Sequence, residues 1–180
     1  SSDLQARTFR YFYDFAHPVS GLARERNSSD DVVTTGGSGF GLAAFPVAVE
    51  RGFITRAEAL AHCTKVVDFL TYQAERFHGA YPHWLNGATG KTIAFSTKDN
   101  GADLVETAFL IEGLLVLRQY FSGASAEETE LRDKITAIWE GVDWTWFQQN
   151  GQDVYPTLSL IMTIPFRHQQ GMKPCAVPSK

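Results

Sequence analysis

The hydrophobic positions along the chain predict a mostly helical protein. Apolar residues recur at helical spacing in five segments, and capping residues or glycines mark several of the segment ends. Thr55 and Glu58 form a capping box before the third segment, and Asp3 is an N-cap candidate for the first. The five predicted helices cover residues 4–15, 40–50, 55–76, 101–121 and 126–149.

Turn-rich stretches separate these helices. Residues 22–38 are polar and contain two adjacent glycines, a pattern that indicates a long ordered loop. Two short apolar runs flank the turn sequence at 86–90, so we predict a β-hairpin near residues 80–96. Helices in successive hairpins, without an exact repeat of solenoid period, predict an all-α layered or toroidal architecture.

The last segment of the chain breaks the pattern. Residues 155–180 have neither helical nor strand periodicity, and three of the chain's seven prolines fall at or after residue 165. We therefore divide the chain into residues 1–154, a helical unit, and residues 155–180, a tail that is a poor candidate for an ordered element.

Composition excludes several classes of protein. The chain has 180 residues, of which 44% are hydrophobic, and this balance is typical of a folded protein. A net charge of −4 disfavours nucleic-acid binding, and no run approaches the ~18 apolar residues of a membrane span. Cys63 and Cys175 are not a spaced pair, so neither a disulfide framework nor a metal site is indicated. The aromatic content of 13% is the unusual feature.

Three carboxylates carry the clearest chemical signal. Asp99, Asp103 and Glu106 are spaced i, i+4 and i+7, which places them on one face at the amino end of the predicted fourth helix. The helix dipole favours negative charge there, whereas mutual repulsion raises the pKa of at least one carboxyl. A protonated carboxyl beside an ionised one can serve as a general acid and its partner. The alternative is that Asp99 caps the helix and the other two are ordinary surface charges.

Aromatic residues near these acids favour a carbohydrate site. The residues that follow, 108–115, are strongly apolar, so the fourth helix belongs to the core. His83, Trp84 and Phe95 stand close before it in the sequence. A sugar stacks its C–H face on aromatic rings while its hydroxyls bond to carboxylates, and this combination of residues suits both contacts.

Two other segments are weaker candidates. The Arg-Glu-Arg triplet at 24–26 could clamp hydroxyls or a carboxylate, or could be a solvated charge run. The glycine-rich stretch 34–41 lacks the Gly-Lys-Ser/Thr ending of a phosphate loop, so close packing of a helix start explains it better. His62 and His168 have no ligand spacing.

Four passages together resemble the bacterial glycoamylase-like family, which includes endo-β-1,2-glucanases of glycoside hydrolase family 144. They are TFRYFYDF with HPVSGLARER, VTTGGSGFG, ERFHGAYPHW and KDNGADLVETAFL. The resemblance covers about residues 4–153 and is specific when the motifs are taken together.

This resemblance implies the N-terminal half of an (α/α)6 toroid, with an acidic cleft that hydrolyses glucan chains without a cofactor. Asp99, Asp103 and Glu106 fall where the family places acidic residues of the cleft. The members are commonly exported to the periplasm or cell surface of bacteria, so the same location is expected here. The fold is associated with β-1,2-glucans more firmly than with starch, so the expected partner is a β-glucan oligo- or polysaccharide. The oligomeric state stays open.

The chain departs from the family after residue 153. The relatives continue with a Ser-Pro-Asn-Tyr motif and a Tyr-Asn-Glu motif, whose glutamate faces the cleft. Our hypothesis is that residues 155–180 are translated in a shifted reading frame, because the shifted codons of 160–163 and 172–175 can encode similar motifs. Coincidence through codon degeneracy is the alternative. Inverting hydrolysis needs two carboxyls ~6.5–9.5 Å apart across the substrate. Because this chain lacks the later motif whose glutamate faces the cleft, we expect little or no activity from it.

The leading interpretation is therefore a fragment of a β-1,2-glucan hydrolase that acts by acid/base cleavage. The expected roles are acid, base or positioning group for Asp99, Asp103 and Glu106, sugar stacking for Trp84 and Phe95, and hydroxyl contact for Arg26 and His83. The alternatives are a non-catalytic carbohydrate-binding or interaction module, a truncated inactive gene product, and a glucoamylase-type α-glucan hydrolase. The glucan linkage, endo or exo action and the stereochemical outcome are left open.

Overall fold

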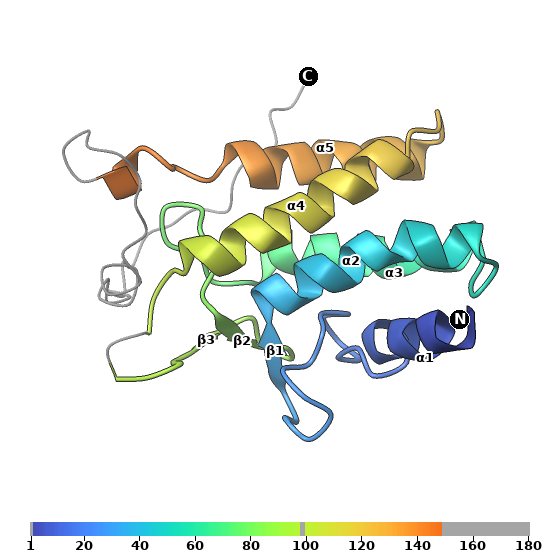
Figure 1. Cartoon of the computed structure of the whole chain (residues 1–180). Coiled ribbons are helices and arrows are strands. Elements are labelled where there is room, and N and C mark those ends of the chain that lie inside the picture. The colour runs from blue at the N-terminus through green and yellow to red at the C-terminus, as the bar shows by residue number, and fades with distance from the viewer. Residues whose placement is uncertain (1, 98–99, 149–180) are drawn as a thin grey trace.

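The structure is a computed structural model that describes residues 2–97 and 100–148 (Figure 1). Its elements are α1 (Ser2–Tyr13), β1 (Val32–Thr34), α2 (Thr35–Glu50), α3 (Arg56–Tyr72), β2 (Trp84–Asn86), β3 (Thr92–Ile93), α4 (Leu104–Tyr120), α5 (Ala126–Glu140) and a 3₁₀ turn at Trp146–Gln148. The five predicted helices are confirmed, although their ends differ. The predicted tail and the reading-frame hypothesis concern residues outside the described part.

Capping residues in the sequence correctly predict the start of α3 but not the start of α1. The capping box of α3 is confirmed: Thr55 Oγ1 accepts the Glu58 N–H at 3.2 Å, and the Glu58 carboxylate accepts the Thr55 N–H at 2.7 Å. The N-cap role predicted for Asp3 is wrong, because α1 begins at Ser2 and Asp3 lies inside the first turn. There its carboxylate pairs with Arg7 at 3.0 Å.

α2 begins five residues earlier than its hydrophobic pattern predicts. Glycine has low helix propensity, so the glycine-rich stretch before Phe40 does not look helical in sequence. The glycines allow a close crossing with α4, because a Cβ at Gly39 would overlap the backbone of Phe109. A Cβ at Gly113 on α4 would in turn overlap the backbone of Gly39. Close packing of the helix start, which the sequence favoured over phosphate binding, is confirmed.

Two helices end earlier than predicted. α3 ends at Tyr72 instead of about residue 76, and the Glu75 N–H then bonds to the Gly90 carbonyl at 2.8 Å. α5 ends at Glu140 instead of residue 149. There the chain is captured by tertiary contacts, since the Asp143 N–H bonds to the His78 carbonyl at 2.9 Å. Such long-range bonds compete with the next helical turn, and periodicity cannot reveal them.

The small sheet contains the predicted hairpin and one strand that the sequence did not reveal. β2 and β3 pair antiparallel, with Trp84 opposite Ile93, which confirms the hairpin. β1 adds to the other edge of β2 with Val33 opposite Leu85, both fully buried. The interpretation of residues 22–38 as a loop is therefore wrong at 32–34 and again at 35–38, which open α2. A strand of three residues is too short to show alternation.

The helices pack around α2. Figure 1 shows α2 beside α4, and α2 also packs against α1 and α3, while α5 covers α3 and α4. Some large apolar side chains of α2 and α4 are exposed: Phe40 is 61% exposed, and its ring centroid lies 5.1 Å from that of Phe109. Val47 and Val116 are exposed on the same two helices. None of the helices that the structure describes is long and apolar enough to cross a membrane.

Candidate functional site

Asp103 is the N-cap of α4 and does not lie on its face. Its Oδ1 accepts the N–H of Glu106 at 2.9 Å, so the two acids are joined across the first turn of the helix. The predicted helical face of three acids is therefore wrong, because α4 begins after Asp103. Asp99 lies outside the described residues.

Glu106 reaches across to the amino end of α2. Its Oε2 accepts the N–H of Gly36 at 3.0 Å, and the Thr34 hydroxyl lies 3.5 Å from the same atom. Thr34 is the N-cap residue of α2, but its side chain makes no capping hydrogen bond, so the carboxylate of Glu106 takes that place. A Cβ at Gly36 would overlap this carboxylate. Negative charge at a helix start is favoured by the helix dipole.

Two helix starts hold the segment at residues 81–83 between them. On the α4 side, Thr107 Oγ1 accepts the Tyr81 N–H at 2.8 Å, and the Asp103 N–H donates to the Tyr81 carbonyl at 2.8 Å. On the α2 side, the Thr35 hydroxyl donates to the Pro82 carbonyl at 2.8 Å. The first turns of α2 and α4 thus meet above the small sheet, as Figure 1 shows.

His83 emerges from this segment beside Asp103. Its Nδ1 is 3.4 Å from Asp103 Oδ2. Burial raises the pKa of the Asp103 carboxyl, but the contact with His83 and the hydrogen bonds from backbone amides outweigh burial and leave the pKa below its ordinary value. Asp103 is therefore not the carboxyl with a raised pKa that clustering predicts. An ionised Asp103 suits a hydrogen-bond acceptor or a base better than a general acid.

The predicted aromatic residues form one cluster around His83. The Phe95 ring lies 4.5 Å from the His83 ring and 4.8 Å from the Trp84 ring, measured between centroids. Phe95 is 45% exposed, so the cluster presents an open aromatic surface next to Asp103, which His83 contacts. The structure thus brings together Asp103, Glu106, His83, Trp84 and Phe95. Such a surface can stack on the C–H face of a sugar ring.

Arg26 lies in the loop before β1, and its neighbour Glu25 is a residue to which sequence reasoning gave no role of its own. Arg26 is exposed, and its Nη2 donates to Glu25 Oε1 at 2.7 Å. That hydrogen bond is the main reason why the pKa of Glu25 is lowered; burial opposes the shift, and the charge of His83 adds to it. Glu25 is therefore an electrostatic neighbour of His83. The Arg-Glu-Arg triplet was the available signal.

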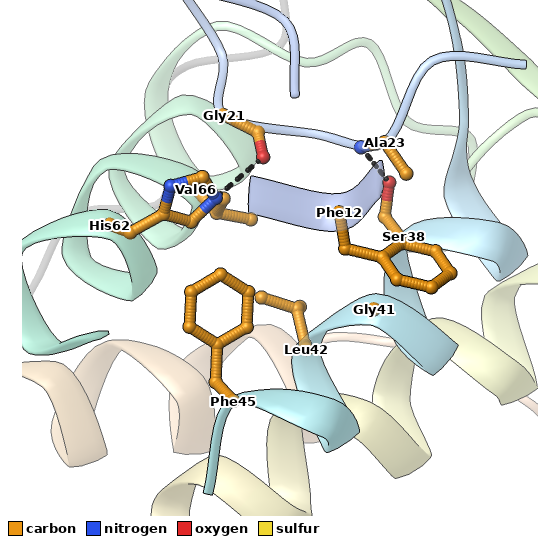
Figure 2. Close-up of a pocket in the computed structure, with 9 residues that line it drawn as sticks. All are labelled: Phe12, Gly21, Ala23, Ser38, Gly41, Leu42, Phe45, His62 and Val66. Atoms are coloured by element: carbon orange, nitrogen blue, oxygen red, sulfur yellow. Dashed lines mark hydrogen bonds between the residues drawn. The ribbon is translucent and has the colours of Figure 1, made fainter. Parts of the chain in front are cut away.

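His62 lines a small cavity away from the candidate site. Figure 2 shows the cavity between the first loop, α2 and α3, with the His62 ring stacked on Phe45 and its Nε2 2.9 Å from the Gly21 carbonyl. Its volume of about 10 Å³ is at the lower limit for a single water molecule and excludes a sugar. His62 is a partly buried histidine whose ring packs on Phe45, and these contacts give it a structural role. Within residues 2–97 and 100–148, no three His, Cys, Asp or Glu side chains gather as a metal site would require.

Comparison with known proteins supports the resemblance. No protein-family model matches the chain. An exo β-1,2-glucooligosaccharide sophorohydrolase of Parabacteroides distasonis is 47% identical over 148 residues, which are 81% of this chain and 20% of that protein. The chain therefore spans about one fifth of the length of this curated relative.

Solved structures agree with the sequence comparison. A putative glucoamylase from Bacteroides uniformis matches 84% of this chain with a TM-score of 0.81 and 47% identity, and the match covers 38% of that protein. The endo-β-1,2-glucanase from Chitinophaga pinensis, in complex with sophorotriose and glucose, matches 83% with a TM-score of 0.78 and 46% identity, over 39% of its length. The all-α class and the toroid-like fold are thus confirmed for the part that is present. Over about four fifths of its length, the chain is similar to proteins named as putative glucoamylases or as β-1,2-glucan hydrolases, and it corresponds to a part of their length.

Proposed function

We propose that this chain forms one wall of a site that binds β-1,2-linked glucan and, in a complete enzyme, hydrolyses it. The observation that carries the proposal is the meeting of Asp103 and Glu106, at two helix starts, with the aromatic cluster of His83, Trp84 and Phe95. Carboxylates beside an open aromatic surface are what a sugar site requires. The names of the relatives support the choice of β-1,2-glucan as substrate.

The proposed roles follow from the geometry. Asp103, with a lowered carboxyl pKa, accepts a hydrogen bond from a substrate hydroxyl or from the attacking water. Glu106 is held at the start of α2 and presents a second carboxylate to the same side. Phe95 and Trp84 stack on a glucose ring. Asp99 stays a predicted member of this acidic group.

Binding without turnover is the expected behaviour of the chain on its own. Glycoside hydrolysis needs two carboxyls on opposite sides of the glycosidic bond, ~5–5.5 Å apart for retention and ~6.5–9.5 Å apart for inversion. Asp103 and Glu106 belong to the same helical turn, and both accept hydrogen bonds from backbone amides at helix starts. We infer that they act on one side of the substrate, and that the opposing carboxylate is supplied by a part of the enzyme that this chain does not span.

The test is a pair of measurements on the same preparation. Isothermal titration with sophorotriose should detect binding, and maltotriose at the same concentration should bind more weakly. Release of reducing sugar from β-1,2-glucan should be at most a small fraction of that of the Chitinophaga enzyme. Absence of sophorotriose binding would refute the proposal, and turnover like that of the complete enzyme would refute the one-sided arrangement.

A non-catalytic carbohydrate-binding module is the second candidate. Both carboxylates accept hydrogen bonds from backbone amides, and this favours a binding module because a residue that only caps a helix has no catalytic role. Asp103→Asn distinguishes the two, since asparagine keeps the N-cap. In a complete enzyme the change abolishes turnover and spares binding, whereas a binding module has no turnover to lose. Reducing-sugar release from starch tests the glucoamylase-type alternative, which the name of the Bacteroides relative favours. Export to the periplasm or cell surface remains a prediction.

A further inference from the structure

His83 is held from several directions at once. Its backbone carbonyl accepts the N–H of Thr35 at 3.2 Å, which ties it to the start of α2. Its ring lies 4.5 Å from Phe95 and 5.5 Å from Trp84. Its Nδ1 lies 3.4 Å from Asp103 Oδ2 on α4. Both the backbone and the ring of His83 therefore have defined surroundings before any ligand arrives.

Charged groups of opposite sign surround the imidazole. Asp103 faces it from the start of α4, and Glu25 interacts with it electrostatically from the loop before β1. Arg26 is paired with Glu25 and partly offsets that carboxylate. The Glu106 carboxylate accepts the N–H of Gly36 at the start of α2. An imidazole between two carboxylates is stabilised when it carries a proton, because both negative charges attract it.

We propose that His83 is a positioning residue of this site, which orients the Asp103 carboxylate and supports the aromatic surface on which the sugar stacks. This role differs from the direct hydroxyl contact that residue type alone indicates, and it rests on the proposed function only where sugar affinity is concerned. Asp103 Oδ1 is fixed by the N–H of Glu106, and the contact of Oδ2 with His83 stops the carboxylate from rotating about that bond.

The arrangement also links the acid to the stacking surface. Phe95 packs on the His83 ring and on Trp84, so a change at residue 83 removes support from the ring that meets the sugar. One side chain thus influences two parts of the site that act on different faces of a glucose unit. A histidine meets both demands, because it combines a flat ring with a nitrogen that can donate a hydrogen bond.

The first experiment needs no sugar. The carboxyl ¹³C shift of Asp103 is followed by NMR against pH in the wild type, in His83→Phe and in His83→Asn. Phenylalanine keeps the ring and removes the donor, so the pKa of Asp103 should rise. Asparagine keeps a neutral donor near the position of Nδ1, so the rise should be smaller. An Asp103 titration in His83→Phe identical to that of the wild type would overturn the proposal.

A matched control is available in the same chain. His78 is also partly exposed, lies 3.9 Å from an aspartate, Asp143, and stacks on an aromatic ring, that of Trp146. His78→Phe should leave the Asp103 titration unchanged. A measurement on the wild type covers the case in which the His83 variants do not fold. The ring ¹⁵N shifts of wild-type His83 should change as Asp103 titrates. Shifts that do not respond to that titration would contradict the contact.

The second experiment measures sophorotriose affinity at pH 7. We expect His83→Phe to bind about tenfold more weakly, because the Asp103 carboxylate that accepts the sugar hydroxyl is no longer held in one orientation, and His83→Asn to recover part of that loss. Unchanged affinity in both variants overturns the positioning role. If the wild type binds no sophorotriose but the titrations differ as expected, the contact with Asp103 stands and the proposed function fails.

Discussion

Glu106 on α4 caps the amino end of α2 through the N–H of Gly36, at 3.0 Å. The residue that precedes α2, Thr34, makes no such bond with its own side chain. One helix therefore supplies the cap of another, and the same contact places a carboxylate at the candidate site. The contact leads to the first prediction.

We predict that Glu106→Ala destabilises the fold by about 1–2 kcal/mol, because α2 loses both its cap and a favourable charge at its positive end. Glu106→Gln should cost less, since the amide oxygen still accepts the Gly36 N–H. Urea denaturation measures both changes. Glu112→Gln is the matched control, because Glu112 is exposed on the same helix, and it should shift stability by less than about 0.5 kcal/mol.

Because α2 and α4 cross closely, we predict that one added methyl group at the crossing destabilises the fold. In Gly39→Ala the new Cβ would overlap the backbone of Phe109, which cannot move aside as a side chain can. We expect a loss of about 3 kcal/mol or more, or failure to fold. Gly52→Ala is the contrast: its φ is +69°, but nothing lies near its Cβ, so about 1–2 kcal/mol is expected. Equal losses in the two variants would contradict the close crossing.

The N-cap role of Asp103 predicts that two substitutions at this position differ in their effect on stability. Asp103→Ala removes the cap of α4 and should lower the free energy of unfolding by about 1 kcal/mol, whereas Asp103→Asn keeps the acceptor for the Glu106 N–H. Thermal denaturation monitored by circular dichroism checks the difference. If both variants lose the same stability, the charge of Asp103 matters to the fold and the cap does not.

The contacts of Glu128 predict that the folded protein loses stability in acid. Its carboxylate forms two hydrogen bonds with Arg56, at 3.0 and 3.1 Å, and accepts the Gly123 N–H. The hydrogen bonds from Arg56, with a smaller contribution from the Gly123 amide, outweigh burial and lower the pKa of Glu128. A carboxyl with a lowered pKa in the folded state contributes stability above its unfolded pKa of about 4.5, and that contribution is lost as the pH falls through the folded value.

The measurement is urea denaturation between pH 7 and pH 3 for the wild type and Glu128→Gln. The variant should be less stable at pH 7 by about 1–2 kcal/mol, because Arg56 loses its charged partner. The gap should narrow as the pH falls below about 4.5. A constant gap across the range would show that Glu128 contributes through packing instead of charge.

The helices were predictable because the evidence for them is local. Apolar spacing and the capping box at Thr55 and Glu58 lie within a few residues of one another, and the helix that they predict is present. The hairpin was predictable for the same reason, since Asn86 and Gly90 form its turn. Errors concentrate at helix ends such as Glu140, where partners distant in the sequence decide whether another turn forms.

The candidate site was predictable in its residues and not in its arrangement. Residue type pointed to Asp103, Glu106, Trp84 and Phe95, and the structure brings them together. The spacing rule failed for the acids, because it assumed a helix that includes Asp103 when the helix begins after it. The triplet that contains Glu25 was noticed, but the relation of Glu25 to His83 was not, because it joins parts of the chain that are far apart in sequence.

The helical class, the number of helices in the described part and the pool of acids and aromatic rings were predictable, since each depends on neighbours along the chain. Tertiary structure decided which of these residues meet. Glu106 caps α2 only because glycines let two helices cross closely, and His83 reaches Asp103 only because both helix starts hold residues 81–83. Contacts across 20 to 70 residues depend on how helices pack, and packing leaves no periodic signal in a single sequence.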